Sequence, residues 1–198
     1  MKKMNYLLGL GLLLGITTLA GCTDNEAPEI ENEEEIITDV TLTFAPDGGG
    51  PAIVASAQDP DGEGPEELAI VSDIVLAANT SYTLTLDLEN SIAGESIAEE
   101  VEEEADEHMF FFGWTAGLFT DPTGDGNIGA NNRADPVNYE DVDDNGEPLG
   151  LETTWTTGDA TTGTFRVILK HQPDIKSTTS TSNDGESDID ITWGTTIN

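Results

Sequence analysis

Short runs in which apolar and polar residues alternate constrain the fold of this chain more than any other feature. The clearest run is Thr80–Leu88, and the same period of two recurs in Val40–Phe44, Phe165–Leu169 and Ile189–Trp193. Alternation puts successive side chains on opposite faces of a strand, so each run predicts a strand with one buried face. Further strands are expected at residues 51–57, which return from the turn at 46–50, and at 68–76 and 151–157. The pattern predicts an all-β protein, an antiparallel immunoglobulin-like β-sandwich or, as the alternative, a small antiparallel barrel.

Two stretches depart from this alternation. Residues 95–107 contain eight acids, with Ile97, Val101 and Ala105 four apart, a pattern that fits a short helix or an acidic edge segment. Residues 108–114, HMFFFGW, have apolar side chains at both odd and even positions. This second pattern predicts a strand that is covered on both faces.

The N-terminal stretch Leu19-Ala20-Gly21-Cys22 resembles the bacterial lipoprotein box, in which cleavage leaves the cysteine for attachment of lipid such as palmitate. It follows Lys2-Lys3 and an apolar run that is too short and too rich in glycine for a membrane-spanning helix. Asp24 and Glu26 just after it are similar to the signal of surface-displayed lipoproteins, which favours the cell surface over the periplasmic face of the outer membrane. The predicted organisation is a signal peptide at 1–21, a lipidated Cys22 with a flexible acidic tether at 22–35, and a β-sandwich domain at 36–198.

The charge of the chain is strongly negative, because forty Asp and Glu residues stand against six Lys and Arg and give a net charge of −34. Such a surface repels nucleic acid and attracts divalent cations. The single cysteine leaves no disulfide, so the core or bound ions must stabilise the domain. The sequence contains no recognisable nucleophile motif, and we expect a non-catalytic protein.

Residues 141–152, DVDDNGEPLGLE, resemble an EF-hand calcium loop, with alternating oxygen ligands, a glycine for the turn and a closing glutamate. The flanking residues are poor helix formers, so a lone loop between strands with weak affinity for Ca²⁺ is expected. The alternative is a solvated acidic turn. The predicted calcium ligands are Asp141, Asp143, Asn145, Glu147 and Glu152.

Two other acidic turns, one of them within a long polar loop at 118–138, alternate oxygen-bearing side chains without completing such a loop. These weaker calcium candidates are Asp59, Asp61, Glu63, Asp121, Asp125 and Asn127.

The two histidines of the chain suggest a different ion. His108 begins the aromatic strand and His171 ends the strand that starts near Thr164. If these strands are neighbours, the two imidazoles and nearby carboxylates can bind Zn²⁺ or copper. The alternative is a pair of structural histidines at strand ends.

The lipobox, the acidic tether and the β-rich domain together resemble small acidic outer-membrane lipoproteins of Gram-negative bacteria that accompany nutrient transporters. The stretches EADEHMFFF (Glu104–Phe112) and LKHQPD (Leu169–Asp174) are similar to stretches of that family. Some members are labelled as having a type 1 periplasmic-binding fold, which is a two-lobed α/β structure, whereas this sequence has no βαβ alternation. The expected functions are a calcium-stabilised binding module, an accessory that passes zinc, copper or iron to an outer-membrane transporter, or a surface adhesin.

Overall fold

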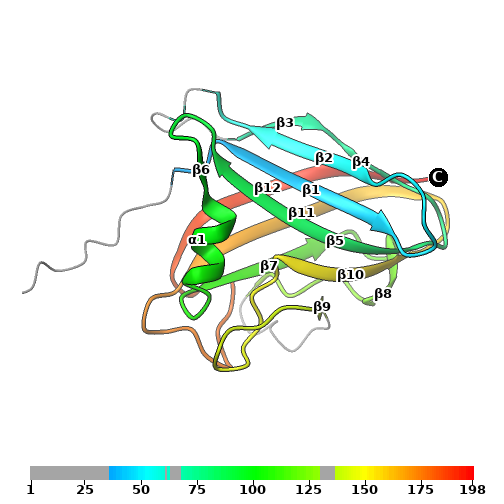
Figure 1. The fold of residues 1–198 in the computed structure, drawn as a ribbon. Coiled ribbons are helices and arrows are strands. Elements are labelled where there is room, and N and C mark those ends of the chain that lie inside the picture. The colour runs from blue at the N-terminus through cyan, green and yellow to red at the C-terminus, as the bar shows by residue number, and fades with distance from the viewer. Residues whose placement is uncertain (1–35, 61, 63–67, 130–136) are drawn as a thin grey trace, which may run out of the picture. The chain divides into compact units, whose positions relative to one another are not determined.

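The predicted strands form two sheets (Figure 1). The structure is a computed structural model that describes residues 36–60, 62, 68–129 and 137–198. The first sheet has the order β3-β2-β1-β5-β10-β8, with β6 beside β5 and β9 beside β10. Its strands are β1 (Asp39–Pro46), β2 (Ile53–Gln58), β3 (Ala69–Ser72), β5 (Ser81–Asn90), β6 (Glu95–Ser96), β8 (Phe119–Asp121), β9 (Asn138–Tyr139) and β10 (Glu152–Thr157). The second sheet has the order β4-β12-β11-β7 and consists of β4 (Ile74–Leu76), β7 (His108–Trp114), β11 (Thr161–His171) and β12 (Glu186–Ile197).

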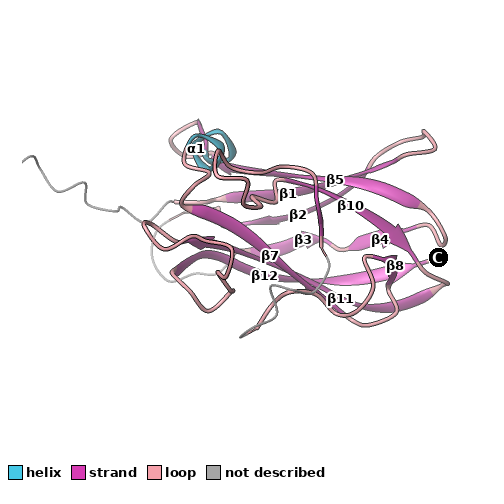
Figure 2. Ribbon diagram, turned by 90° about the horizontal axis from the view of Figure 1, so that it is seen from below, coloured by secondary structure: helices cyan, strands magenta, loops and turns pink. Residues whose placement is uncertain are grey.

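The main hydrophobic core lies between the two sheets, which form separate layers in Figure 2. Alternate residues of β1 and β5, such as Leu42 and Leu84, point into it and are fully buried. Near its centre Trp155 packs edge-on against Trp114 and Phe165, with ring centroids 5.0 and 5.1 Å apart. Among the described strands every pairing is antiparallel except that of β4 with β12. The expected all-β antiparallel sandwich is confirmed, and the described residues do not form the α/β lobes that the periplasmic-binding label implies.

The ambiguous acidic stretch divides into an edge strand and a helix. β6 pairs with the end of β5, and α1 (Ile97–Glu103) begins after Ser96, whose side chain accepts the N–H of Glu99 at 3.3 Å. Ile97 and Val101 are buried, so the apolar stripe outweighs the repulsion among the acids. No helix in the described part of the chain is long and apolar enough to cross a membrane.

β7 is covered on both faces, as its sequence predicts. Phe110 and Phe112 belong to the main core, whereas Met109 and Phe111 pack with Ile168 in a second cluster on the outer face of the sheet. The strand that carries the aromatic block is therefore among the most deeply buried elements of the fold.

Loops close the open edge of β7. The N–H of Phe110 donates to the carbonyl oxygen of Leu149 at 2.7 Å, and the N–H of Phe112 donates to the side-chain oxygen of Asn127 at 2.9 Å. A covered edge leaves few backbone groups for pairing with another chain. The described parts of these loops, around Asn127 and Leu149, are therefore structural parts of the sandwich.

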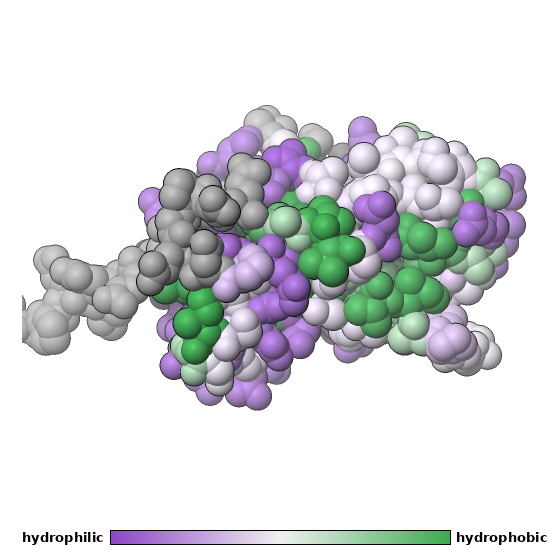
Figure 3. Space-filling model, turned by 90° about the horizontal axis from the view of Figure 1, so that it is seen from above, coloured by the Kyte–Doolittle hydropathy of each residue, from purple (hydrophilic) through white to green (hydrophobic). Residues whose placement is uncertain are grey.

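Strands β2, β3 and β4, on the opposite side of the sandwich, carry exposed aliphatic side chains. Val54 of β2, Ile70 and Val71 of β3, and Val75 of β4 are between 38% and 61% exposed. Figure 3, which views this side, shows separate apolar patches among polar atoms. β3 and β4 have four and three residues, and such short edges limit strand addition.

Candidate metal centre

His108 and His171 lie side by side at one end of the second sheet. His108 is the first residue of β7 and His171 the last of β11, and the antiparallel register pairs them directly. Their rings stack with centroids 4.4 Å apart and planes 18° from parallel. Both residues are buried, with 0% and 5% exposure. The condition of the sequence hypothesis, that the two strands be neighbours, is therefore met.

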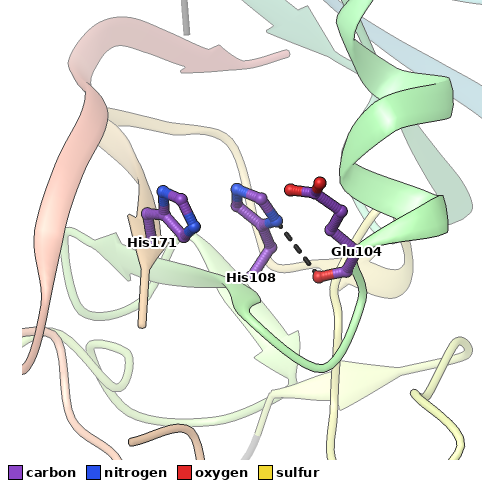
Figure 4. Close-up of side chains that lie close together, drawn as sticks. All are labelled: Glu104, His108 and His171. Atoms are coloured by element: carbon purple, nitrogen blue, oxygen red, sulfur yellow. Dashed lines mark hydrogen bonds between the residues drawn. The ribbon is translucent and has the colours of Figure 1, made fainter. Parts of the chain in front are cut away.

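Glu104 joins the two histidines in a group of three candidate metal ligands (Figure 4). Glu104 is the C-cap residue of α1, and the turn 104–107 connects it to His108. Its side chain lies beside the imidazole of His108 (Figure 4). One ligand atom from each of Glu104, His108 and His171 lies within 4.8 Å of the other two. Within the described ranges this is the one set of three or more His, Cys, Asp or Glu side chains that is so close. Glu104 is exposed, so solvent reaches the group at this carboxylate.

Hydrogen-bond acceptors beside the rings orient both histidines. Nδ1 of His108 lies 3.2 Å from the carbonyl oxygen of Glu104, and Nε2 of His171 lies 3.2 Å from Oε2 of Glu107. With the protons on these nitrogens, the lone pairs are on Nε2 of His108 and Nδ1 of His171. Metal-binding histidines usually donate their other N–H to a carboxylate or a backbone carbonyl in this way.

Binding of an ion at this group would require the three ligand atoms to move closer together. Zinc binds imidazole nitrogen and carboxylate oxygen at about 2.0–2.2 Å, so two ligands of a tetrahedral site are about 3.3 Å apart. The contraction from 4.8 Å is therefore about 1.5 Å at most. Closure would also require one ring to rotate about χ2, because the two imidazole rings are nearly parallel. The χ2 torsion of histidine has a broad energy minimum. Three protein ligands leave a further position for water or for a ligand from a partner.

An acidic groove of about 690 Å³ runs between α1 and the loop 141–152 and includes Ala105, the residue after Glu104. The carboxylates that line it are Asp87, Glu99, Glu102, Glu103, Asp106, Asp141, Asp143, Asp144 and Glu152. A concave surface with one sign of charge concentrates counter-ions. The groove therefore raises the local concentration of cations along α1 and the turn that follows it, although none of the three candidate ligands lines the groove.

The predicted calcium loop folds as a turn whose first aspartate binds the protein itself. Both oxygens of Asp141 accept backbone N–H groups, from Gly150 and Leu151 at 2.7 Å and from Glu152 at 3.1 Å. The side chains of Asn145 and Glu152 are exposed. Within the described chain, the carboxylates of this loop do not form a group of three within 4.8 Å. The structure thus brings the two histidine candidates together, whereas the carboxylates of the predicted calcium loop do not form such a group.

Asp143 is buried and paired with a lysine from another loop. Its Oδ1 accepts the N–H groups of Asn145 and Glu147 at 2.9 and 2.8 Å, and its Oδ2 lies 3.0 Å from Nζ of Lys176. Burial raises the pKa of Asp143, but the N–H of Glu147 and the Lys176 ammonium outweigh burial and hold the pKa below the ordinary 3.8. A calcium ion at Asp143 would have to displace Lys176, and calcium binding here stays a prediction.

The first of the weaker calcium turns is described only in part. Asp59 is buried and accepts the N–H of Gly62 at 3.3 Å. Asp61 and Glu63 lie outside the described residues, as does the predicted lipidation site Cys22.

The second of the weaker calcium turns, with Asp121, Asp125 and Asn127, does not direct its three side chains to one site. Asp121 and Asp125 are exposed. Asn127 is buried, and its side chain accepts the N–H of Phe112 and donates to the hydroxyl of Tyr139. The oxygen that was predicted to bind calcium is therefore engaged in closing the edge of β7.

Comparisons with protein-family models, curated proteins and solved structures find no match to this chain. Sequence reasoning did not single out Glu104, Glu107 or Lys176. Glu104 stands four residues before His108, and this i, i+4 spacing was a detectable signal. The position of Lys176 offered no such signal, because its contact with Asp143 joins two separate loops.

Proposed function

We propose that this protein is a non-catalytic, lipid-anchored module of the cell envelope that binds Zn²⁺ or copper at Glu104, His108 and His171. The observation that carries the proposal is the grouping of two buried imidazoles and one carboxylate within 4.8 Å. Burial of two polar rings costs desolvation free energy, which a shared ion would offset. Imidazole with one carboxylate suits zinc and copper, whereas calcium prefers six to eight oxygens.

The acidic groove supports a role in metal handling. It concentrates cations at residues next to Glu104 in the chain, such as Glu103 and Ala105. A site with three protein ligands and an open position can pass its ion to a ligand on another protein. An outer-membrane transporter is the partner that the sequence resemblance favours.

A competition titration of the purified protein against a chromophoric chelator, with Zn²⁺ and separately with Cu²⁺, tests the site. Loss of a residue that merely supports a ligand costs about 10–100-fold in affinity, so His108→Gln, His171→Gln and Glu104→Gln should each cost about 100-fold or more. The matched control is Glu102→Gln, which removes a carboxylate of α1 and of the same groove but lies outside the group. Equal zinc affinity of the wild type and the double variant His108→Gln/His171→Gln would reject the site.

The anchor is supported by the lipobox at Cys22 and has its own test. In a bacterial host, the wild type should fractionate with membranes and incorporate a palmitate analogue. Cys22→Ser should lose the label and the membrane association, because no other cysteine is present to accept the lipid. A labelled Cys22→Ser variant would contradict this assignment.

A further inference from the structure

The two segments next to the candidate ligands are hydrogen-bonded to each other. Residues 172–176 directly follow β11, and the turn 104–107 directly precedes β7. Nζ of Lys176 donates to the carbonyl oxygen of Ala105 at 2.6 Å. The turn that carries the carboxylate ligand is therefore held by a side chain from the loop that follows the second histidine.

Lys176 is itself fixed by two further contacts. Its ammonium lies 3.0 Å from Oδ2 of Asp143, and both side chains are 1% exposed. Its backbone N–H donates to the carbonyl oxygen of Gln172 at 3.0 Å, and the N–H of Gln172 donates to the carbonyl oxygen of Glu107 at 2.6 Å. A continuous set of bonds thus runs from the acidic loop 141–152 through Lys176 to two residues of the turn, Ala105 and Glu107.

The contacts of Lys176 are strengthened by their exclusion from solvent. Hydrogen bonds and ion pairs gain strength in the low dielectric of the interior, and removal of one partner leaves a buried charge without compensation. The turn 104–107 supplies the carboxylate of Glu104 and, through Glu107, the acceptor that orients His171. Residues that support and orient metal ligands contribute about 10–100-fold to metal affinity, so a loosened turn would weaken binding.

We propose that Lys176 is the positioning residue of the metal centre, held by Asp143 and holding the carbonyl of Ala105. The inference rests on the proposed function. It also assigns a role to the EF-hand-like loop 141–152. In place of a calcium ion, Asp143 of this loop binds the ammonium of Lys176, and the loop thereby supports the turn of the neighbouring metal centre.

The test compares Lys176→Met with a matched control, Lys170→Met. Both remove a buried ammonium and keep an aliphatic stem, but Lys170 donates to Ser187 on β12 and lies outside the set of bonds. The readouts are zinc affinity by competition and the absorption spectrum of bound Co²⁺, which reports ligand geometry. Lys176→Met should weaken zinc binding by about 10–100-fold, as loss of a supporting residue does, and shift the Co²⁺ bands. Lys170→Met should change neither.

The outcomes separate the two proposals. If the wild type binds zinc and folded Lys176→Met binds it with equal affinity and an unchanged Co²⁺ spectrum, the positioning role is overturned while the metal site stands. If the wild type binds neither zinc nor copper, the proposed function itself fails. Should Lys176→Met not fold, Lys176→Gln and Asp143→Asn test the same contacts, and wild-type zinc affinity in both would overturn the inference.

Discussion

Replacement of Asn127 by alanine tests whether the loop after β8 is ordered by the protein or by calcium. Asn127 is 1% exposed, and its Oδ1 accepts the N–H of Phe112 at 2.9 Å. Its Nδ2 donates to the hydroxyl of Tyr139 at 2.8 Å, and that hydroxyl donates to the carbonyl oxygen of Phe110 at 2.7 Å. The side chain therefore replaces a neighbouring strand along the edge of β7.

The cost follows from these bonds. A typical hydrogen bond contributes about 0.5–1.5 kcal/mol, and a buried N–H left without an acceptor costs about 1–3 kcal/mol. Asn127→Ala removes two bonds and strips the N–H of Phe112 of its acceptor, so we expect a loss of about 2–4 kcal/mol in the free energy of unfolding. In a domain of this size 1 kcal/mol shifts Tm by about 2–4 °C, so Tm should fall by about 4–16 °C.

Urea unfolding followed by tryptophan fluorescence measures this loss, once in chelator and once in Ca²⁺ at about 1 mM, where weak extracellular loops are occupied. The loss should be the same in both solutions, because the bonds are internal to the protein. The control Asn183→Ala changes an exposed asparagine and should stay within about 0.5 kcal/mol of the wild type. A loss below about 1 kcal/mol for Asn127→Ala, or one seen only with calcium, would refute the structural role.

Two further predictions concern the buried carboxylate of Asp143 and the close approach of Gly126 to the backbone of β7. The pKa of Asp143 is lowered by its N–H and Lys176 contacts, so their contribution to stability is complete above about pH 4 and is lost as the pH falls through the lowered pKa. The stability penalty of Asp143→Asn, measured by denaturant unfolding, should therefore shrink as the pH falls below about 4, and a penalty that grows there would contradict the assignment. Gly126 and Gly124 both have positive φ, but only at Gly126 would a Cβ collide with the carbonyl oxygen of Phe112. Gly126→Ala should thus lower the free energy of unfolding by about 1–3 kcal/mol more than Gly124→Ala, and equal losses in thermal unfolding would count against this close approach.

Local patterns determined much of the architecture. The alternation in Thr80–Leu88 predicts the buried face of β5, because side-chain direction along a strand depends only on backbone geometry. The aromatic run 108–114 likewise predicts a strand covered on both faces. The run 68–76 was one predicted strand or strand pair, and the fold separates it at Asp73 into β3 of one sheet and β4 of the other. That separation depends on which strands pack nearby, which no local pattern records.

The candidate metal centre needed the tertiary structure. The sequence by itself determined that the chain attracts cations and that two histidines stand at strand ends. Only the order of the second sheet placed β7 beside β11 and so brought His108 against His171, and only loop packing set Lys176 on Asp143. The physical reason is that strand propensity is a property of neighbours along the chain, whereas ligand groups form between distant segments whose adjacency is decided by the packing of the whole domain.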